Sequence, residues 1–196
     1  MIVSTNPLDE DASWTCETCG HILLSKQIIW GNNALKEELH KLVKTNPKEF
    51  EQFIDKYSQT LHPSNHFVVQ CKLALMQIYG NFKGYNLPDL PDHLLKRKID
   101  LCHELLELAD KLEPGWTKFR GDILLDLQAA MMMQAKKEFE SGQITKAGAQ
   151  DTLMESMTLL QEATNILRVE PHMKAVLEIK IQELTNLLEA TSPEDK

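Results

Sequence analysis

The chain has 196 residues, of which 42% are hydrophobic, 6% aromatic and 26% charged, and its formal net charge is -8. This composition is typical of a folded, helical protein that can bury its own core. The acidic excess disfavours nucleic acid or an anionic membrane as a partner, because affinity for phosphates comes from clustered Lys and Arg.

The first candidate site is a Cys-x-x-Cys pair, Cys16 and Cys19, in a segment over residues 1–31 that otherwise predicts loops. Such a turn directs two thiolates at one ion, whereas a closed tetrahedral zinc site needs four ligands. No second Cys-x-x-Cys follows in the sequence, and His21 is a further candidate ligand. We interpret the pair as half of a zinc knuckle, with two ordinary surface thiols as the alternative. Zinc is therefore the candidate cofactor, through an incomplete site, and we expect this chain alone to hold it weakly or not at all.

Helical periodicity begins at residue 32, where apolar residues start to recur every three or four positions. One helix is predicted over about 32–43, and Pro47 suits the first turn of the next. A third is predicted from about Asn65 to Tyr79, with Gly80 just past its end. We assign residues 32–82 to this first helical part.

The second half begins after a loop with two Gly and two Pro, and consists of four long amphipathic stretches, over 91–112, 116–139, 144–169 and 173–190. Long helices joined by short turns predict an all-α fold of tetratricopeptide-like helical hairpins, stacked as an α-solenoid or a bundle. No strict 34-residue consensus is present. This helical domain is assigned to residues 83–191, with a flexible polar tail over 192–196.

The helical period also predicts which side chains are buried. Cys71 and Cys102 lie among Val, Leu and Ile and are predicted to be core thiols. The predicted core of the second half comprises Leu95, Ile99, Leu105, Leu108, Ile123, Leu127, Leu159, Leu160, Ile166, Leu177 and Leu184.

Other constellations predict structure more than chemistry. His62 and His66 have the four-residue spacing of a helical metal pair, but Pro63 between them predicts a helix-joining turn instead. The sequence has no Gly-rich phosphate loop, no Gly-x-Ser-x-Gly and no His-Glu-x-x-His, so no active site is predicted. The first twelve residues lack the order of a signal peptide, and no apolar run reaches the ~20 residues of a membrane span. We expect a cytoplasmic and/or nuclear protein.

Three stretches together resemble one family, the arthropod-type SET and MYND domain proteins, in the region that follows the SET fold. They are STNPLDEDASWTCETCGHIL, KYSQTLHPSNHFVVQCKLALMQIYG and ADKLEPGWTKFRGDILLDLQAA. The first is similar to the end of the family's cysteine segment, Trp-x-Cys-x-x-Cys. The second is similar to its Leu-His-Pro and His before a helix, and the third to its Pro-Gly and Arg-Gly helix junction.

The resemblance implies a C-terminal helical domain that docks protein partners and closes one wall of a substrate cleft. The family comprises S-adenosylmethionine-dependent protein-lysine methyltransferases, but its Gly-x-Gly strand, Asn-His-x-Cys and Glu-Glu-Leu-x-x-x-Tyr motifs are not in this chain. The resemblance therefore implies ancestry and fold without catalysis or cofactor binding, in a fragment or a stand-alone remnant. It also implies an upstream Cys-x-x-Cys as the other half of the zinc site. The alternative is an independent acidic scaffold or adaptor, unrelated to methyl transfer, that meets a basic protein.

Overall fold

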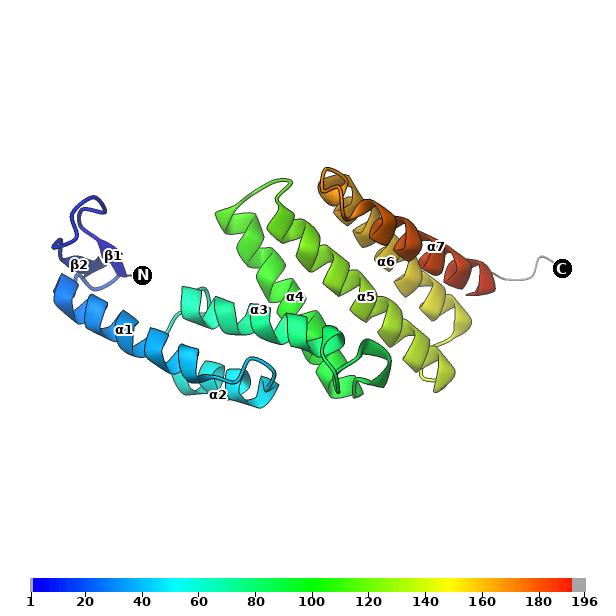
Figure 1. Cartoon of the computed structure of the whole chain (residues 1–196), viewed down its shortest axis with the longest axis horizontal. Coiled ribbons are helices and arrows are strands. Elements are labelled where there is room, and N and C mark those ends of the chain that lie inside the picture. Colours follow the sequence, from blue (N-terminus) through cyan, green and yellow to red (C-terminus); the bar gives the residue numbers. More distant parts are fainter. Residues whose placement is uncertain (1, 192–196) are drawn as a thin grey trace. The chain divides into compact units, whose positions relative to one another are not determined.

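The computed structural model describes residues 2–191, which form seven α-helices, one short 3-10 helix and one small sheet (Figure 1). The chain divides into two compact units, the first ending at Glu49 and the second beginning at Phe50, within helix α2. The predicted fold of packed helix pairs is confirmed, with the sheet as an addition. The predicted tail over residues 192–196 lies outside the described residues.

The first unit contains a three-stranded antiparallel sheet in the order β1-β2-β3, followed by helix α1. Ile2 pairs with Cys16 between the first two strands, and Trp14 pairs with Leu23 between the last two. The elements are β1 (Ile2–Ser4), β2 (Trp14–Cys16), β3 (Ile22–Leu23) and α1 (Ser25–Lys41). The prediction of loops throughout 1–31 is therefore wrong for the strands and for the start of α1.

Helix α1 begins seven residues earlier than the period at Asn32 predicts, because polar contacts start it. The Leu24 N–H donates to Gln27 Oε1 at 2.9 Å, which satisfies one of the donors that a helix N-terminus leaves free. The Ser25 hydroxyl donates to the carbonyl of Glu10 and is buried. Because these contacts are polar, the apolar period of the sequence does not reveal where α1 begins.

The second unit stacks its helices in chain order. Helix α3 packs on α4, α4 on α5, α5 on α6 and α6 on α7, and α4–α7 lie side by side in Figure 1. This is the stacking of neighbouring hairpins that defines a helical array. The elements are α2 (Pro47–Tyr57), α3 (His66–Asn81), the 3-10 helix η1 (Leu87–Asp89), α4 (Asp92–Leu112), α5 (Lys118–Glu140), α6 (Lys146–Leu167) and α7 (Lys174–Thr191).

Side-chain caps fix where three of these helices begin. Asn65 Oδ1 accepts the Phe67 N–H at 3.0 Å at the start of α3. Thr117 and Thr145 accept the N–H three residues on, both at 3.2 Å, at the starts of α5 and α6. Asn, Ser and Thr caps of this kind each stabilise a helix by about 1 kcal/mol. At the other end of α3, Gly80 has a φ of +113° and breaks the helical geometry.

The predicted core is confirmed with two exceptions. Ile99 and Leu159 are only partly buried and pack against the core, whereas the other predicted core residues are buried. Cys71 and Cys102 have no exposed surface, as predicted. Buried side chains of α5, α6 and α7 form one cluster, and those of α3, α4 and α5 form a second.

Helices α5 and α6 approach each other closely at Gly121. A Cβ on Gly121 would lie 2.8 Å from Leu167 Cγ and 3.0 Å from Ile166 Cγ2. Carbon atoms in ordinary contact are about 3.5–4.0 Å apart, so no larger residue fits there without displacing the α6 side chains.

Candidate metal half-site and ion network

The Cys-x-x-Cys lies at the turn between β2 and β3. Cys16 is the last residue of β2, and its N–H donates to the His21 carbonyl at 2.8 Å. The Gly20 N–H donates to the Cys16 carbonyl at 2.8 Å. Gly20 has a φ of +71°, which favours glycine at this position. The turn thus curls around the first cysteine, which is the geometry expected of a metal knuckle.

The sulfur of Cys16 receives hydrogen bonds from its own turn. The backbone N–H of Cys19, then that of Thr18, and then the Cys19 side chain lower the pKa of Cys16 from 9.0 to about 7. Donors aimed at a sulfur stabilise its thiolate, the form that binds metals. The two cysteines of the turn are therefore close together, and the turn favours the thiolate form of Cys16.

The described residues do not complete a zinc site around this pair. Within residues 2–191, no group of three or more His, Cys, Asp or Glu side chains is placed to hold a metal ion. Cys71 and Cys102 are buried in the second unit, and burial raises the pKa of each thiol to about 12. A closed structural zinc site takes four ligands, so one chain fits half of it.

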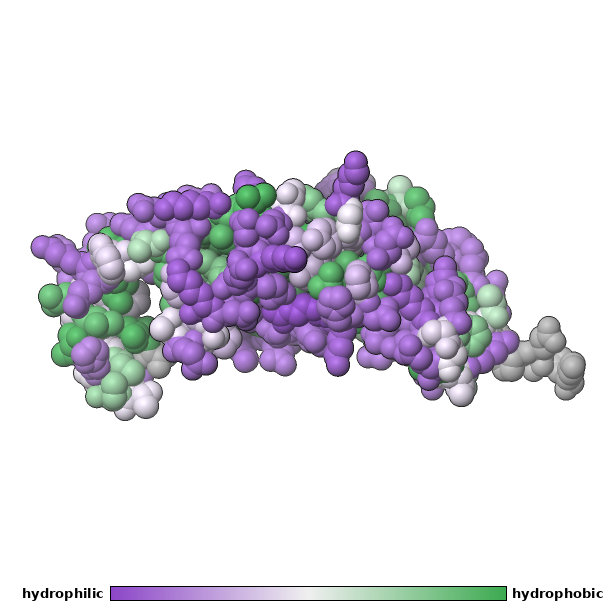
Figure 2. All heavy atoms as spheres, turned by 90° about the horizontal axis from the view of Figure 1, so that it is seen from below, coloured by the Kyte–Doolittle hydropathy of each residue, from purple (hydrophilic) through white to green (hydrophobic). Residues whose placement is uncertain are grey.

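Apolar side chains gather on the surface of the first unit. In Figure 2 green apolar surface is concentrated at the left end, over the strands of this unit. Trp30 is 76% exposed, Ile22 63% and Leu24 62%, although all three are large and apolar. The only buried residue of α1 is Ser25. The first unit therefore has little core of its own, and much of its apolar surface is in contact with water.

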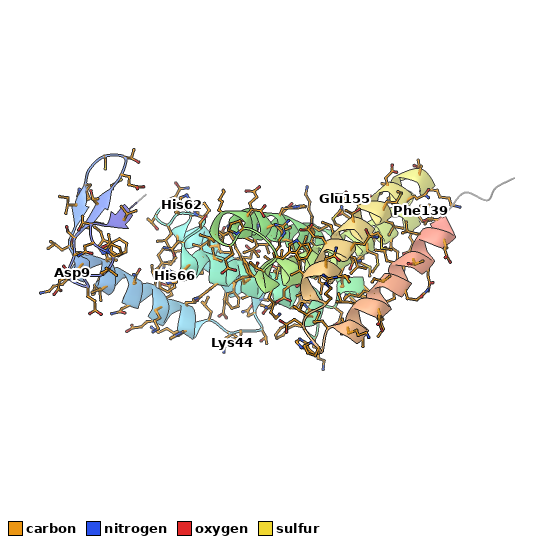
Figure 3. The ribbon with its side chains drawn as sticks, turned by 90° about the horizontal axis from the view of Figure 1, so that it is seen from above. Asp9, Lys44, His62, His66, Phe139 and Glu155 are labelled. Atoms are coloured by element: carbon orange, nitrogen blue, oxygen red, sulfur yellow. The ribbon has the colours of Figure 1, made fainter. Side chains whose placement is uncertain are left out.

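His62 and His66 of the second unit have separate local contacts. His62 and His66 lie at the turn between α2 and α3 (Figure 3), which confirms the predicted helix-joining turn. His62 Nδ1 accepts the Ser64 N–H at 3.1 Å, and the ring of His66 lies 3.7 Å from the ring of Phe67. Each ring thus has its own local contacts.

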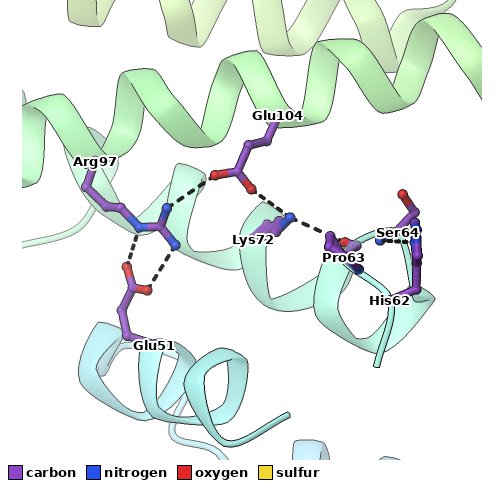
Figure 4. Close-up of polar contacts among 7 residues, drawn as sticks. All are labelled: Glu51, His62, Pro63, Ser64, Lys72, Arg97 and Glu104. Carbon is purple, nitrogen blue, oxygen red and sulfur yellow. Dashed lines mark hydrogen bonds and ion pairs between the residues drawn. The ribbon is translucent and has the colours of Figure 1, made fainter. Parts of the chain in front are cut away.

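A chain of ion pairs joins α2, α3 and α4 (Figure 4). Arg97 binds both carboxylate oxygens of Glu51, through Nε at 3.0 Å and Nη2 at 3.1 Å, and lies 3.4 Å from Glu104. Glu104 in turn pairs with Lys72 at 2.6 Å. Lys72 also donates to the Pro63 carbonyl at 3.3 Å. The network fixes the three helices and the turn before α3 to one another.

The electrostatics of this network favour fixed charges over proton transfer. Burial opposes the charge of Arg97, but the hydrogen bond and charge of Glu51 outweigh it and raise the pKa of Arg97. Burial and then the Glu51 carboxylate raise the pKa of Tyr79 from 10.0 to about 12. Both groups keep their protons near pH 7, so neither is poised as a general base.

A second ion pair is buried deeper in the array. Lys98 is 1% exposed, and its Nζ donates to Asp126 at 2.5 Å and to the Met76 carbonyl at 2.7 Å. Periodicity could have indicated it, because Lys98 falls between Leu95 and Leu101 on the buried side of α4. The acidic partners of the two networks are not indicated by periodicity. Asp126 lies 28 residues from Lys98, and Glu51 lies 46 residues from Arg97.

A groove lies beside the first network. It has a volume of about 400 Å³ and is lined by residues of α3, of α4 and of the turn before α3, among them His62, Val69, Lys72, Glu104, Leu108 and Lys111. Charges of both signs line it, and Lys72 and Glu104 neutralise each other. Its lining includes His62 and Ser64, and His62 Nδ1 accepts the backbone N–H of Ser64.

No protein-family model matches the chain, and no curated protein matches it. Among the helices in residues 2–191, none is both long and apolar enough to cross a bilayer.

Proposed function

We propose that this chain is the non-catalytic, protein-binding C-terminal part of a SET and MYND family protein-lysine methyltransferase, comprising its cysteine segment and its helical domain. Methyl transfer requires a SET core outside this chain. The helical unit holds protein partners, and Cys16 and Cys19 contribute two ligands to a zinc site that other cysteines complete.

The observation that carries the proposal is the order of the parts. A hairpin with a Cys-x-x-Cys turn is followed in the chain by a helical array, in which α3 to α7 each pack on the next helix. A helical array of this kind leaves long helix faces and inter-helix grooves available to other proteins. The groove between α3 and α4, which Lys72 and Glu104 line, is such a surface.

Calorimetric titration with S-adenosylmethionine tests the non-catalytic part of the proposal. We expect no saturable heat, and no methyl transfer to histones or to a mixed protein substrate, because the family's cofactor and catalytic motifs are not in the sequence. An active SET-domain methyltransferase in the same assay serves as the positive control. Saturable binding of the cofactor would contradict the proposal.

An independent acidic scaffold is the second candidate, and the net charge of -8 favours it. Charge acts on encounter with basic partners at long range, so this candidate predicts binding that weakens steeply with salt. The family proposal does not predict this steep dependence on salt, because docking in a groove with charges of both signs depends mainly on shape.

A further inference from the structure

The metal half-site of the first unit has two ligands where zinc needs four. Cys16 and Cys19 lie at the tip of the β2–β3 hairpin, and the turn residues from Glu17 to His21 are all exposed. Within residues 2–191 the chain folds no third ligand toward them. A closed site therefore needs two further ligands, and the exposed hairpin tip is accessible to them.

A second copy of the chain carries the two further thiols that a closed site needs. Two identical Cys-x-x-Cys turns facing each other give four thiolates around one ion, which is the tetrahedral arrangement of a structural zinc site. Such a contact has two-fold symmetry and closes on itself, as most homodimer contacts do. Solvent water could fill the open positions, but it would leave the ion weakly held.

The surface next to the turn suits the same contact. Ile22 and Leu24 follow the turn directly, and each is more than half exposed, as is Trp30 on α1. Units of this size bury a small share of their surface and are marginally stable alone, so a metal ion or a subunit contact adds to their stability. A dimer would give the first unit both a closed metal site and an apolar contact.

We propose that two copies of this chain share one zinc ion through their Cys16 and Cys19 side chains, with the apolar residues beside the turns packed across the two-fold axis. Only the chain's own ligands enter this inference, so it does not depend on the family proposal. In a longer protein that carries the other two cysteines, the same pair would be closed within one chain.

Zinc titration of the purified chain under a thiol reductant, after removal of metal by a chelator, tests the proposal. Light scattering coupled to size exclusion gives the mass, and elemental analysis gives the zinc content. We expect a monomer of 22.4 kDa without zinc, and a dimer with half an equivalent of zinc per chain. Cobalt substituted for zinc should give the absorption of a tetrahedral thiolate site.

Matched variants separate the parts of the proposal. Cys19→Ser should remove both zinc retention and the dimer, whereas His21→Ala, which keeps the backbone carbonyl that Cys16 uses, should retain both. Leu24→Asp puts a charge in the apolar contact at a helix N-cap, where Asp is favoured, so α1 is not weakened. It should raise the concentration needed for half-dimerisation about tenfold or more, equivalent to about 1.4 kcal/mol.

Four results would overturn the proposal. They are one tightly held zinc per monomer, a dimer that persists without metal, zinc retention in Cys19→Ser, and a wild-type chain that retains no zinc. Loss of zinc in His21→Ala would show that the chain closes the site with its own histidine. An unchanged dimer in Leu24→Asp would remove the apolar contact from the proposal.

Discussion

Replacing Gly121 by Ala tests how tightly α5 and α6 are packed. In a helix interior, Ala is favoured over Gly by about 0.5–1 kcal/mol, so propensity alone predicts stabilisation. The new Cβ would lie 2.8 Å and 2.9 Å from Leu167 Cγ and Cδ2, about 1 Å closer than a comfortable contact. Leu167 is fully buried and cannot turn into solvent. Overpacking of this kind costs about 1–3 kcal/mol, so we expect a net loss of about 1–2 kcal/mol.

Gly148 in α6 provides the matched control for this substitution. A Cβ there would meet Thr145 Oγ1 at 3.6 Å and Ile144 Cβ at 3.7 Å, which are ordinary contacts. We expect Gly148→Ala to stabilise the same unit by a few tenths of a kcal/mol, up to about 1. Urea unfolding followed by circular dichroism measures both variants. With an m-value of about 2 kcal/mol/M, Gly121→Ala should lower the midpoint by roughly 0.5–1 M. Equal stabilisation by the two substitutions would refute the packing we describe.

Two further predictions concern buried ionisable groups of the helical unit. Lys98→Met should lower the free energy of unfolding in urea by about 3 kcal/mol, because Asp126 loses its cation. Adding Asp126→Leu should restore most of the lost stability. A double variant as unstable as the single one would contradict this prediction. Burial raises the pKa of the Cys102 thiol from 9.0 to about 12. The neutral thiol therefore contributes fully to the stability of the fold below pH 9, and this contribution is lost as the pH rises towards 12, by up to about 4 kcal/mol. The stability of Cys102→Ala should therefore fall less steeply than that of the wild type between pH 9 and 11, and equal slopes would exclude this role for the thiol.

The helices of the second unit were predictable because their signals are local. A regular apolar period marks each of them, and Asn65 caps α3 as expected, while Gly80 breaks the helical geometry just before the end of α3 at Asn81. The strands of the first unit were not predictable, because each has only two or three residues and shows no alternation. The start of α1 was missed because its contacts, from Leu24 to Gln27 and from Ser25 to Glu10, are polar and its apolar side chains face the solvent.

The candidate site was predictable only in part. Spacing alone identified Cys16 and Cys19 and, with Gly20, suggested a tight turn. The hydrogen bonds that lower the pKa of Cys16 depend on the path of that turn, which spacing does not specify. The pairing of Glu51 with Arg97 depends on how α2 packs near α4, and no local pattern encodes a contact across 46 residues.

The family proposal is tested most directly by the sequence of the transcript upstream of the codon for Met1. We predict that the reading frame continues upstream and encodes Asn-His-x-Cys followed by Cys-x-Cys-x-x-Cys, the motifs of the SET core and of the other half of the zinc site. A stop codon in frame before any such motif, or a continuous frame that encodes neither, would contradict the proposal and favour the independent scaffold.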